Sequence, residues 1–136
     1  MKYLFPLFLL LFACTDPLPP IDSSNSNQIR LNQIGYYPDA VKKAIVVDST
    51  MTNTFKLVNT DNMREVFSGH LSTPIKWEIA GQQVQVADFS AFQEAGNYVV
   101  YIPETGYSYP FEIKDHILED AFKASVKGFY LSLIHI

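Results

Sequence analysis

Short apolar stretches separated by Gly, Pro, Asn and Asp recur about every ten residues from Ile29 onward. Stretches of this length and spacing are typical of the strands of a β-sandwich. An apolar repeat with helical spacing occurs only after Asp115. We therefore predict an all-β sandwich of about seven strands, followed by one C-terminal α-helix. The strands are expected at 29–32, 43–48, 54–59, 65–70, 83–88, 97–102 and 109–113, with a less regular stretch around Trp77.

The patterns within these strands predict which side chains are buried. Val84 and Val86 alternate with glutamines, so we expect the valines to face the core and the glutamines to face water. Residues 44–47 and 98–102 are apolar without alternation, which is typical of central strands that are buried on both faces. These two strands are expected to lie deepest.

Three side chains in this unit have both a structural and a functional interpretation. The turn before Tyr98 resembles the tyrosine corner of Greek-key sandwiches, in which the hydroxyl bonds to upstream backbone. Asp88 follows a strand, so we expect its carboxylate to accept backbone N–H bonds in a turn rather than to act in catalysis. Trp77 is the only tryptophan. We expect it to be buried inside the sandwich, and it is also our one candidate for contact with a sugar ring.

The N-terminal residues have the pattern of an export signal. Lys2 precedes an apolar run from Tyr3 to Ala13, which is shorter than the ~20 residues that a membrane-spanning helix needs and suits the centre of a signal peptide. The sequence Leu-Phe-Ala-Cys at 11–14 resembles a bacterial lipobox, which predicts removal of residues 1–13 and lipidation of Cys14. Acyl chains on Cys14 would hold the protein at a membrane surface of the cell envelope. The alternative is an ordinary secretory signal with an incidental cysteine.

The chain between this signal and the first strand differs in composition from the rest. Residues 14–28 are rich in Pro, Ser, Asn and Asp and lack apolar periodicity. Such a stretch buries too little surface to offset the entropy lost on ordering, so we expect a flexible tether.

Charge and cysteine content exclude several classes of protein. Ten basic and fourteen acidic residues give a formal net charge of −4 without a basic run, which argues against nucleic acid as a partner. A single cysteine excludes an internal disulfide and a four-thiolate zinc site. The three histidines lack the spacing of a helical zinc pair.

An apolar stripe with helical spacing follows the last predicted strand. Asp115 can cap the start of this helix, which we expect over about 116–130. A terminal helix with such a stripe requires a partner. It could fold onto the sandwich or belong to a further domain. The stripe consists of Leu118, Phe122, Val126 and Phe129.

The order of motifs along the chain resembles one known domain. The stretch 30–38, followed by 42–47, is similar to the opening of the N-terminal immunoglobulin-like domain of family-nine glycoside hydrolases, which are mostly endoglucanases. The resemblance covers about residues 29–130 and implies an immunoglobulin-like Greek-key sandwich at 29–114 whose role is to pack against and stabilise a catalytic domain. Its later landmarks lie at 66–69, 86–92, 95–98 and 106–113.

The same resemblance assigns the C-terminal helix. In family-nine enzymes the sandwich leads directly into the first helix of an (α/α)6 catalytic barrel, and residues 121–130 are similar to that helix. We therefore interpret 115–130 as the first helix of a barrel that is otherwise missing. The similarity stops at Tyr130. Residues 131–136 resemble translated sequencing-adapter read-through, and we interpret them as a foreign tail, so that His135 receives no catalytic role.

The chain carries no pair of carboxylates suited to glycoside hydrolysis. An inverting enzyme needs a carboxylic acid and a carboxylate base ~6.5–9.5 Å apart. The enzymes that this chain resembles place the base in an Asp-Ala-Gly-Asp segment and the acid in a late Glu, and the sequence contains neither segment. Glu119 and Asp120 are adjacent on the predicted helix and do not face each other. We assign no catalytic, cofactor-binding or metal-binding residue, and we expect the chain alone to be inactive.

The sequence is best interpreted as a fragment of an exported, lipid-anchored β-glucan hydrolase. Its expected partners are the missing barrel, the membrane through Cys14, and the β-glucan substrate of the parent enzyme. Endo or exo action stays open. Two alternatives do not involve an enzyme: a surface module that binds glycan through Trp77 with Tyr36, Tyr37 or Tyr107, and a structural envelope lipoprotein.

Overall fold

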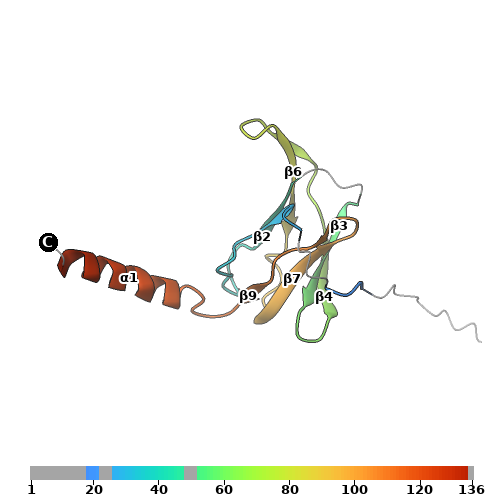
Figure 1. The fold of residues 1–136 in the computed structure, drawn as a ribbon. Coiled ribbons are helices and arrows are strands. Elements are labelled where there is room, and N and C mark those ends of the chain that lie inside the picture. Colours follow the sequence, from blue (N-terminus) through green and yellow to red (C-terminus); the bar gives the residue numbers. More distant parts are fainter. Residues whose placement is uncertain (1–17, 22–25, 48–51, 135–136) are drawn as a thin grey trace, which may run out of the picture.

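A computed structural model describes residues 18–21, 26–47 and 52–134. Nine strands in this part form two antiparallel sheets that pack face to face, and one helix, α1 (Glu119–Ile134), projects from the sandwich (Figure 1). The four-stranded sheet has the order β1 (Ile29–Arg30), β2 (Lys43–Val47), β6 (Gln82–Asp88) and β5 (Ile75–Trp77). The five-stranded sheet has the order β4 (Arg64–His70), β3 (Thr54–Asn59), β7 (Gly96–Ile102) and β8 (Gly106–Tyr107), and β9 (Phe111–Ile113) also pairs with β7.

The predicted all-β sandwich with one C-terminal helix is confirmed. The strand expected at 54–59 has the predicted bounds, and the stretch around Trp77 is an ordered strand, β5. The last strand begins at Phe111 rather than at residue 109 because Pro110 has no backbone N–H to donate to a neighbouring strand. The short strand β8 escaped prediction, since two residues are too few to show a periodicity. Residues 1–13, Cys14 and His135 lie outside the described residues.

The core lies between the two sheets and is rich in aromatic side chains. The ring of Tyr36 meets the rings of Phe89 and Phe111 edge to face, at centroid distances of 5.6 and 5.5 Å. Tyr98 makes the same kind of contact with Phe92 at 5.1 Å. Edge-to-face contacts favour particular orientations of the rings and stabilise the core beyond the burial of their surface. The cluster therefore fixes the two sheets and the loop that carries Tyr36 relative to one another.

Tyr98 forms the predicted tyrosine corner. Its hydroxyl donates a hydrogen bond of 3.3 Å to the carbonyl of Ala95, and its ring is buried at the start of β7. Burial raises the pKa of the Tyr98 hydroxyl above its ordinary value, with the charge of Glu94 acting in the same direction. The hydroxyl therefore stays protonated as a donor.

The strand β6 faces the opposite way to our prediction. Gln85 and Ala87 point into the core, whereas Val84 and Val86 point outward. The reason is the pairing with β2, which sets Gln85 opposite the buried Val46 and thereby on the same face of the sheet. The buried amide of Gln85 donates to the carbonyl of Ser72 at 3.2 Å, so that this polar group is satisfied.

Part of the expected tether lies against the sandwich. Leu18 and Ile21 pack on the outer face of the five-stranded sheet, against Val99 and its neighbours, and the hydroxyl of Tyr107 donates to the carbonyl of Pro19. The prediction of a free tether is therefore wrong for residues 18–21, because two apolar side chains among the prolines supply the contact that composition alone did not reveal. This covering segment leaves β7 buried on both faces, as predicted.

Candidate functional site: the sandwich–helix junction and an outer sheet face

A segment near the start of the sandwich domain, around Tyr36, lies directly beside its last strand, β9. Tyr36 donates its backbone N–H to the carbonyl of Glu112 at 2.9 Å, and Lys114 donates its N–H to the carbonyl of Tyr36 at 3.1 Å. The two bonds flank a parallel bridge between Tyr36 and Ile113. The segment that starts the domain thus holds the segment through which the chain leaves it.

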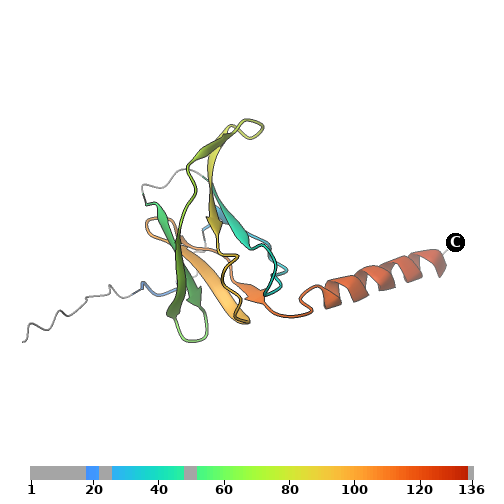
Figure 2. The ribbon, with the colours of Figure 1, turned by 180° about the vertical axis from the view of Figure 1, so that it is seen from behind.

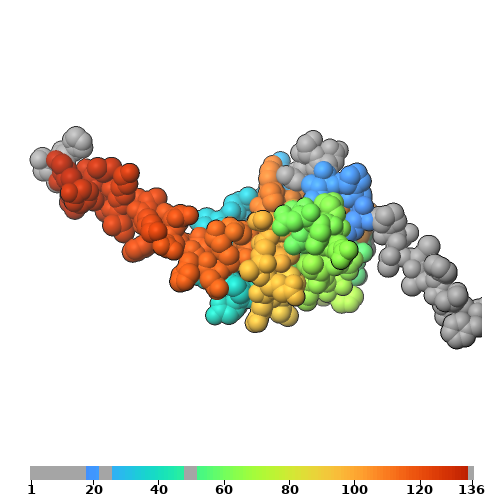
Figure 3. Space-filling model, turned by 90° about the horizontal axis from the view of Figure 1, so that it is seen from below, coloured from blue at the N-terminus to red at the C-terminus, as the bar shows by residue number. Residues whose placement is uncertain are grey.

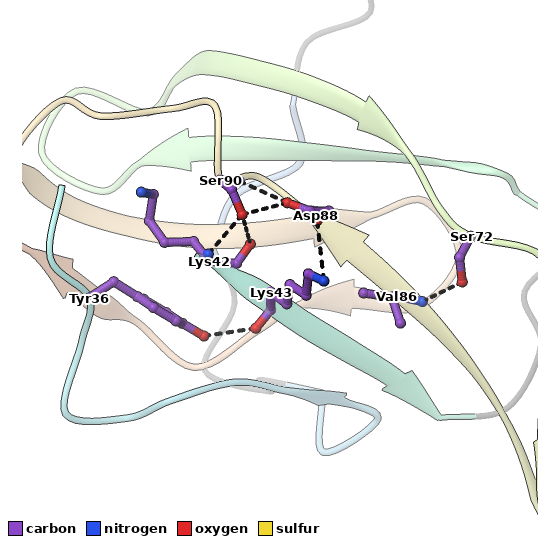
Figure 4. A network of polar contacts seen from close by, with 7 residues as sticks. All are labelled: Tyr36, Lys42, Lys43, Ser72, Val86, Asp88 and Ser90. Carbon is purple, nitrogen blue, oxygen red and sulfur yellow. Dashed lines mark hydrogen bonds and ion pairs between the residues drawn. The ribbon is translucent and has the colours of Figure 1, made fainter. Parts of the chain in front are cut away.

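The side chain of Tyr36 extends this contact to β2. Its hydroxyl donates to the carbonyl of Lys43 at 2.8 Å (Figure 4). The same hydroxyl accepts a hydrogen bond from the backbone N–H of Asn32 at 3.1 Å. Burial raises the pKa of Tyr36, so the hydroxyl is a neutral donor at physiological pH. Tyr36 therefore belongs to the framework of the junction and is not available to a glycan, contrary to one of our alternatives.

The linker to α1 is anchored at Gly35. A Cβ atom at this position would lie 2.8 Å from the side chain of Ile117 and would collide with the carbonyl oxygen of Glu112. Ile117 is only 7% exposed, although it lies in a linker. Glycine at residue 35 thus makes room for Ile117, and Ile117 holds the start of the helix on the sandwich.

The helix begins later than predicted. His116 has a φ of 59°, a left-handed conformation that a right-handed helix does not accommodate, so residues 115–118 form a turn and α1 begins at Glu119. The carbonyl of His116 accepts the first N–H of the helix, that of Glu119, at 2.9 Å. The expected start at residue 116 and the capping role of Asp115 are therefore wrong. The turn gives α1 a defined exit from the sandwich.

The apolar face of α1 is without a partner among the described residues. No side chain of the helix is buried, and Phe122 and Phe129 are 68% and 73% exposed. The helix extends away from the sandwich in all views (Figures 1 to 3). The alternative in which the helix folds onto the sandwich is therefore wrong for this structure. On the polar side, Lys123 and Glu119 form an ion pair at 2.6 Å.

A polar network supports the turn after β6, as predicted for Asp88. The carboxylate of Asp88 accepts the hydroxyl of Ser90 at 2.6 Å and the backbone N–H of Ser90 at 3.0 Å (Figure 4). These bonds, and then the ion pair with Lys43 at 3.6 Å, hold the pKa of Asp88 below its ordinary value. A general acid requires the opposite shift. Asp88 therefore has a structural role here.

Lys42 is a buried cation that the sequence analysis did not single out. Its side chain is fully buried, and the ammonium donates to the carbonyls of Pro38 and Ala40 at 2.6 and 2.8 Å. Burial lowers the pKa of Lys42, while the nearby carboxylates of Asp39 and Asp88 act in the opposite direction. The ammonium ties together the loop that follows Tyr36. A lysine directly before an apolar strand was the one sequence signal for this role.

The described residues contain no cluster of side chains that could bind a metal ion. No group of three His, Cys, Asp or Glu side chains in this part of the chain lies close enough to hold a metal ion. Glu119 and Asp120 are exposed, and Glu119 is occupied by its ion pair with Lys123. Within 18–21, 26–47 and 52–134, no helix is long and apolar enough to cross a membrane.

Trp77 lies at the surface, contrary to the predicted burial. Its side chain is 54% exposed on β5, the edge strand of the four-stranded sheet, among outward-facing aliphatic residues. Tyr107 is buried on the other sheet beneath residues 18–21. The structure thus does not join Trp77 with Tyr36 or Tyr107 into one flat aromatic platform.

Comparison with protein families identifies the family of the sandwich domain. The cellulase N-terminal ig-like domain matches residues 24–107, which is more than half of the chain. The chain belongs to this family. The predicted resemblance to the N-terminal immunoglobulin-like domain of family-nine enzymes is therefore confirmed, and the match contains the opening motif around Tyr36, the tyrosine corner and most of the sandwich.

Individual relatives of this immunoglobulin-like domain are much longer proteins. Endoglucanase D of Acetivibrio thermocellus is 36% identical over 105 residues, which are 77% of the chain and 16% of that enzyme. A xyloglucan-specific endo-beta-1,4-glucanase of Bacteroides ovatus is 35% identical over 121 residues, 89% of the chain and 20% of that enzyme. Because this match covers 121 of the 136 residues, it includes the first residues of α1 at whichever residue the match begins.

Solved structures agree with the fold of this immunoglobulin-like domain. A structure described as Bacteroides ovatus GH9 superimposes with a TM-score of 0.67 and 31% identity, over 76% of the chain and 18% of that protein. A metagenome-derived glycoside hydrolase family 9 endoglucanase gives a TM-score of 0.58 at 27% identity, over 63% of the chain and 18% of that protein. The chain spans between 16% and 20% of the length of the curated relatives named above.

Proposed function

We propose that this chain is the N-terminal part of a family-nine glycoside hydrolase that cleaves β-1,4-glucan. Membership of the cellulase N-terminal ig-like domain family supports this proposal. Two relatives that are 36% and 35% identical to it over 105 and 121 residues are described as endoglucanases. The carboxylates that perform hydrolysis would lie in the polypeptide that follows α1, because the Asp-Ala-Gly-Asp segment that the resemblance implies does not occur in these 136 residues.

The role that we assign to the sandwich is to orient and stabilise the catalytic domain. The observation that supports this role is the fixed contact at the junction. Ile117 is buried against Gly35, and α1, which begins two residues later, has its apolar face exposed to solvent. An apolar helix face needs a partner to cover it, and the first helix of a barrel would find that partner in the rest of the catalytic domain. The sandwich would thus serve as a rigid base for the barrel.

Sequencing of the source locus through the codon for Tyr130 and beyond tests this assignment. We expect an open frame that encodes an Asp-Ala-Gly-Asp segment soon after α1 and a Glu near the end of the barrel. Both carboxylates are then candidates for replacement, and Asp→Asn and Glu→Gln variants of the encoded protein should lose hydrolysis of β-glucan without loss of folding. A stop codon in the genomic sequence after Ile136 would contradict the proposal.

We also propose that the protein is exported and anchored to a membrane of the cell envelope through lipid on Cys14. The support is the sequence alone, namely a short apolar run that ends in Leu-Phe-Ala-Cys at residues 11–14. Expression of residues 1–136 in a bacterial host with a labelled fatty acid tests it. Label and partition into the detergent phase should both be lost in Cys14→Ser. A soluble, unlabelled wild-type product would contradict the anchor.

A second candidate function is glycan binding by the sandwich itself. The exposure of Trp77 favours it, because an exposed indole can stack on a sugar ring. Retention of the chain on insoluble cellulose, and its loss in Trp77→Ala with the fold intact, would support this function. Free passage of the wild-type chain would exclude it for cellulose.

A further inference from the structure

Residues 18–21, here termed the clasp, cover part of the outer face of the five-stranded sheet. Val58 of β3 pairs with Val99 of β7, and both side chains are buried in a cluster separate from the main core. Leu18 and Ile21 of the clasp pack against this cluster. Outer faces of antiparallel sheets in water are ordinarily polar, so an apolar pair on such a face requires a cover. The clasp supplies this cover.

Tyr107 of β8 binds the chain at two points. Its hydroxyl donates a hydrogen bond of 2.5 Å to the carbonyl of Pro19, and its own carbonyl accepts the backbone N–H of Ser26 at 2.8 Å. The ring of Tyr107 lies against that of Tyr101, with a centroid distance of 4.7 Å. The clasp and the residue that leads into the sandwich are therefore both attached to one residue of the sheet.

The chemistry of these contacts makes the clasp a stable attachment. Burial raises the pKa of the Tyr107 hydroxyl, and the neighbouring Tyr101 acts in the same direction. The hydroxyl therefore remains a hydrogen-bond donor at physiological pH. Pro19 and Pro20 have a backbone φ that is fixed by their rings, so that less conformational entropy is lost when the clasp is held in place.

The position of the clasp in the sequence determines how far the domain can move from a lipid on Cys14. Leu18 is only four residues beyond Cys14, whereas Ser26 is twelve residues beyond it. A fully extended chain spans ~3.3–3.6 Å per residue, so that Leu18 lies at most about 14 Å from Cys14. Without the clasp the first attached residue would be Ser26, at a reach of up to about 42 Å. The clasp thus shortens the tether to about a third of its length.

The clasp and α1 lie on opposite sides of the sandwich. Residues 18–21 are at one end of the molecule and the helix extends from the other, both in the ribbon views and in the space-filling view (Figures 1 to 3). The turn between β7 and β8 is next to the clasp, because Glu104 of this turn lines a shallow groove together with Pro19 and Pro20. An anchor attached through the clasp is therefore attached far from the exit of the helix.

We propose that the clasp fixes the lipid anchor to the β7–β8 end of the sandwich, so that this end faces the membrane and α1 points away from it. The inference rests on the proposed lipidation of Cys14 and adds an orientation to it. A tether that was free as far as Ser26 would let the domain turn in any direction above the bilayer. A link of at most about 14 Å at one side holds that side next to the lipid head groups.

The charge near the clasp indicates that the tether, and not attraction to lipid, sets this orientation. Among the residues that line the groove beside the clasp, the one charged side chain is that of Glu104. Attraction to the anionic lipids of a membrane surface requires clustered Lys and Arg. The orientation should therefore be the same on a bilayer without net charge.

Energy transfer from a dye on the lipidated chain to acceptor-labelled lipid measures the orientation. Cys14 is the only cysteine, and its lipidation leaves no free thiol, so a single introduced cysteine can carry the donor dye. The dye is placed either at Glu104→Cys, beside the clasp, or at Asp115→Cys, in the exposed turn before α1. In phosphatidylcholine vesicles we expect transfer from residue 104 to be at least about twofold more efficient than from residue 115. Equal transfer from the two positions would overturn the proposal.

Two variants test whether the clasp is the cause. Leu18→Ser combined with Ile21→Ser removes the apolar contacts and should make transfer from the two dye positions nearly equal. The matched control is Val41→Ser combined with Ile79→Ser, because both side chains are exposed and lie outside the clasp; it should leave the twofold difference unchanged.

A longer tether tests the same point without touching the sandwich. Insertion of about twelve Gly and Ser residues after Thr15 leaves the clasp in place but lengthens the link to the lipid, and it should also make transfer from the two positions nearly equal. A difference that persisted after the insertion would show that the protein surface itself binds the bilayer, and would overturn the role of the clasp.

The outcomes separate this inference from the anchor on which it rests. A lipid-labelled chain with equal transfer from both positions would retain the anchor and overturn the orientation. A chain that carries no lipid on Cys14 would overturn both and would leave the proposed hydrolase function in place.

Discussion

The side chain of Ile117 lies over Gly35 and fills the space that a Cβ atom of residue 35 would need. The two residues are far apart in the sequence, one at the opening of the sandwich and the other in the linker to α1. Their contact converts what would be a flexible hinge into a fixed exit for the helix. The role that we propose for the sandwich therefore rests on this contact and not on a titratable group in the described part of the chain.

Substitution of Gly35 should destabilise the domain strongly. Gly35→Ala would place a methyl group against Ile117 and the carbonyl of Glu112, at a φ of 116°, so we expect a loss of about 3 kcal/mol in the free energy of unfolding. Gly106→Ala is the control, since Gly106 has a φ of 100° but no atom within 4 Å of its Cβ position, and about 1 kcal/mol is expected. Urea denaturation measures both. Equal losses would show that backbone strain, and not the contact with Ile117, makes residue 35 a glycine.

The buried ammonium of Lys42 should contribute more to stability than its exposed neighbour. Lys42→Met leaves the carbonyls of Pro38 and Ala40 without donors, and we expect a loss of about 2 kcal/mol in the free energy of unfolding. Lys43→Met removes a half-exposed ion pair with Asp88 and should cost at most about 0.5 kcal/mol. Thermal and urea unfolding of the two variants measure both losses of stability. A larger loss in Lys43→Met than in Lys42→Met would contradict the prediction.

Asp88 should make the stability of the domain depend on acid pH. Its pKa in the folded state lies below the ordinary value of 3.8, so the carboxylate contributes stability that is fully present above that value and is lost as the pH falls through the folded-state pKa. Ser90→Ala removes the largest cause and should raise the pKa of Asp88 in an NMR titration. Lys43→Met should raise it less. A pKa unchanged by Ser90→Ala would contradict the assigned hydrogen bonds.

The apolar face of α1 should not contribute to the stability of the isolated chain. Phe122→Ser and Phe129→Ser remove rings that touch no buried residue of the sandwich, so the free energy of unfolding of residues 1–136 should change by less than about 0.5 kcal/mol. The same substitutions should reduce self-association, which analytical ultracentrifugation measures. In contrast, Ile117→Ser should destabilise the sandwich, because this side chain is buried. A large loss of stability in the phenylalanine variants would show that α1 folds back onto the sandwich in solution.

Local sequence patterns predicted those features whose cause is local. The strand β3, the hydrogen bond from Tyr98 to Ala95 and the turn at Asp88 depend on alternation or on side chains that reach backbone a few residues away. Each can be recognised without knowing which strands pair. The same holds for the ordered series of motifs that resembles the family-nine immunoglobulin-like domain, because those motifs are themselves turns and strand ends.

Tertiary structure decided the features that depend on strand pairing and on distant contacts. An alternating strand has two equivalent faces until a neighbour selects one, and the pairing of β6 with β2 turned Gln85 inward and Val84 outward, against the prediction. Trp77 became exposed because β5 pairs only at the edge of the sheet. The sequence by itself thus determined most of the strands, the turns at Asp88 and Tyr98 and the family of the domain, whereas the side of each sheet that is buried followed from contacts between residues far apart in the chain.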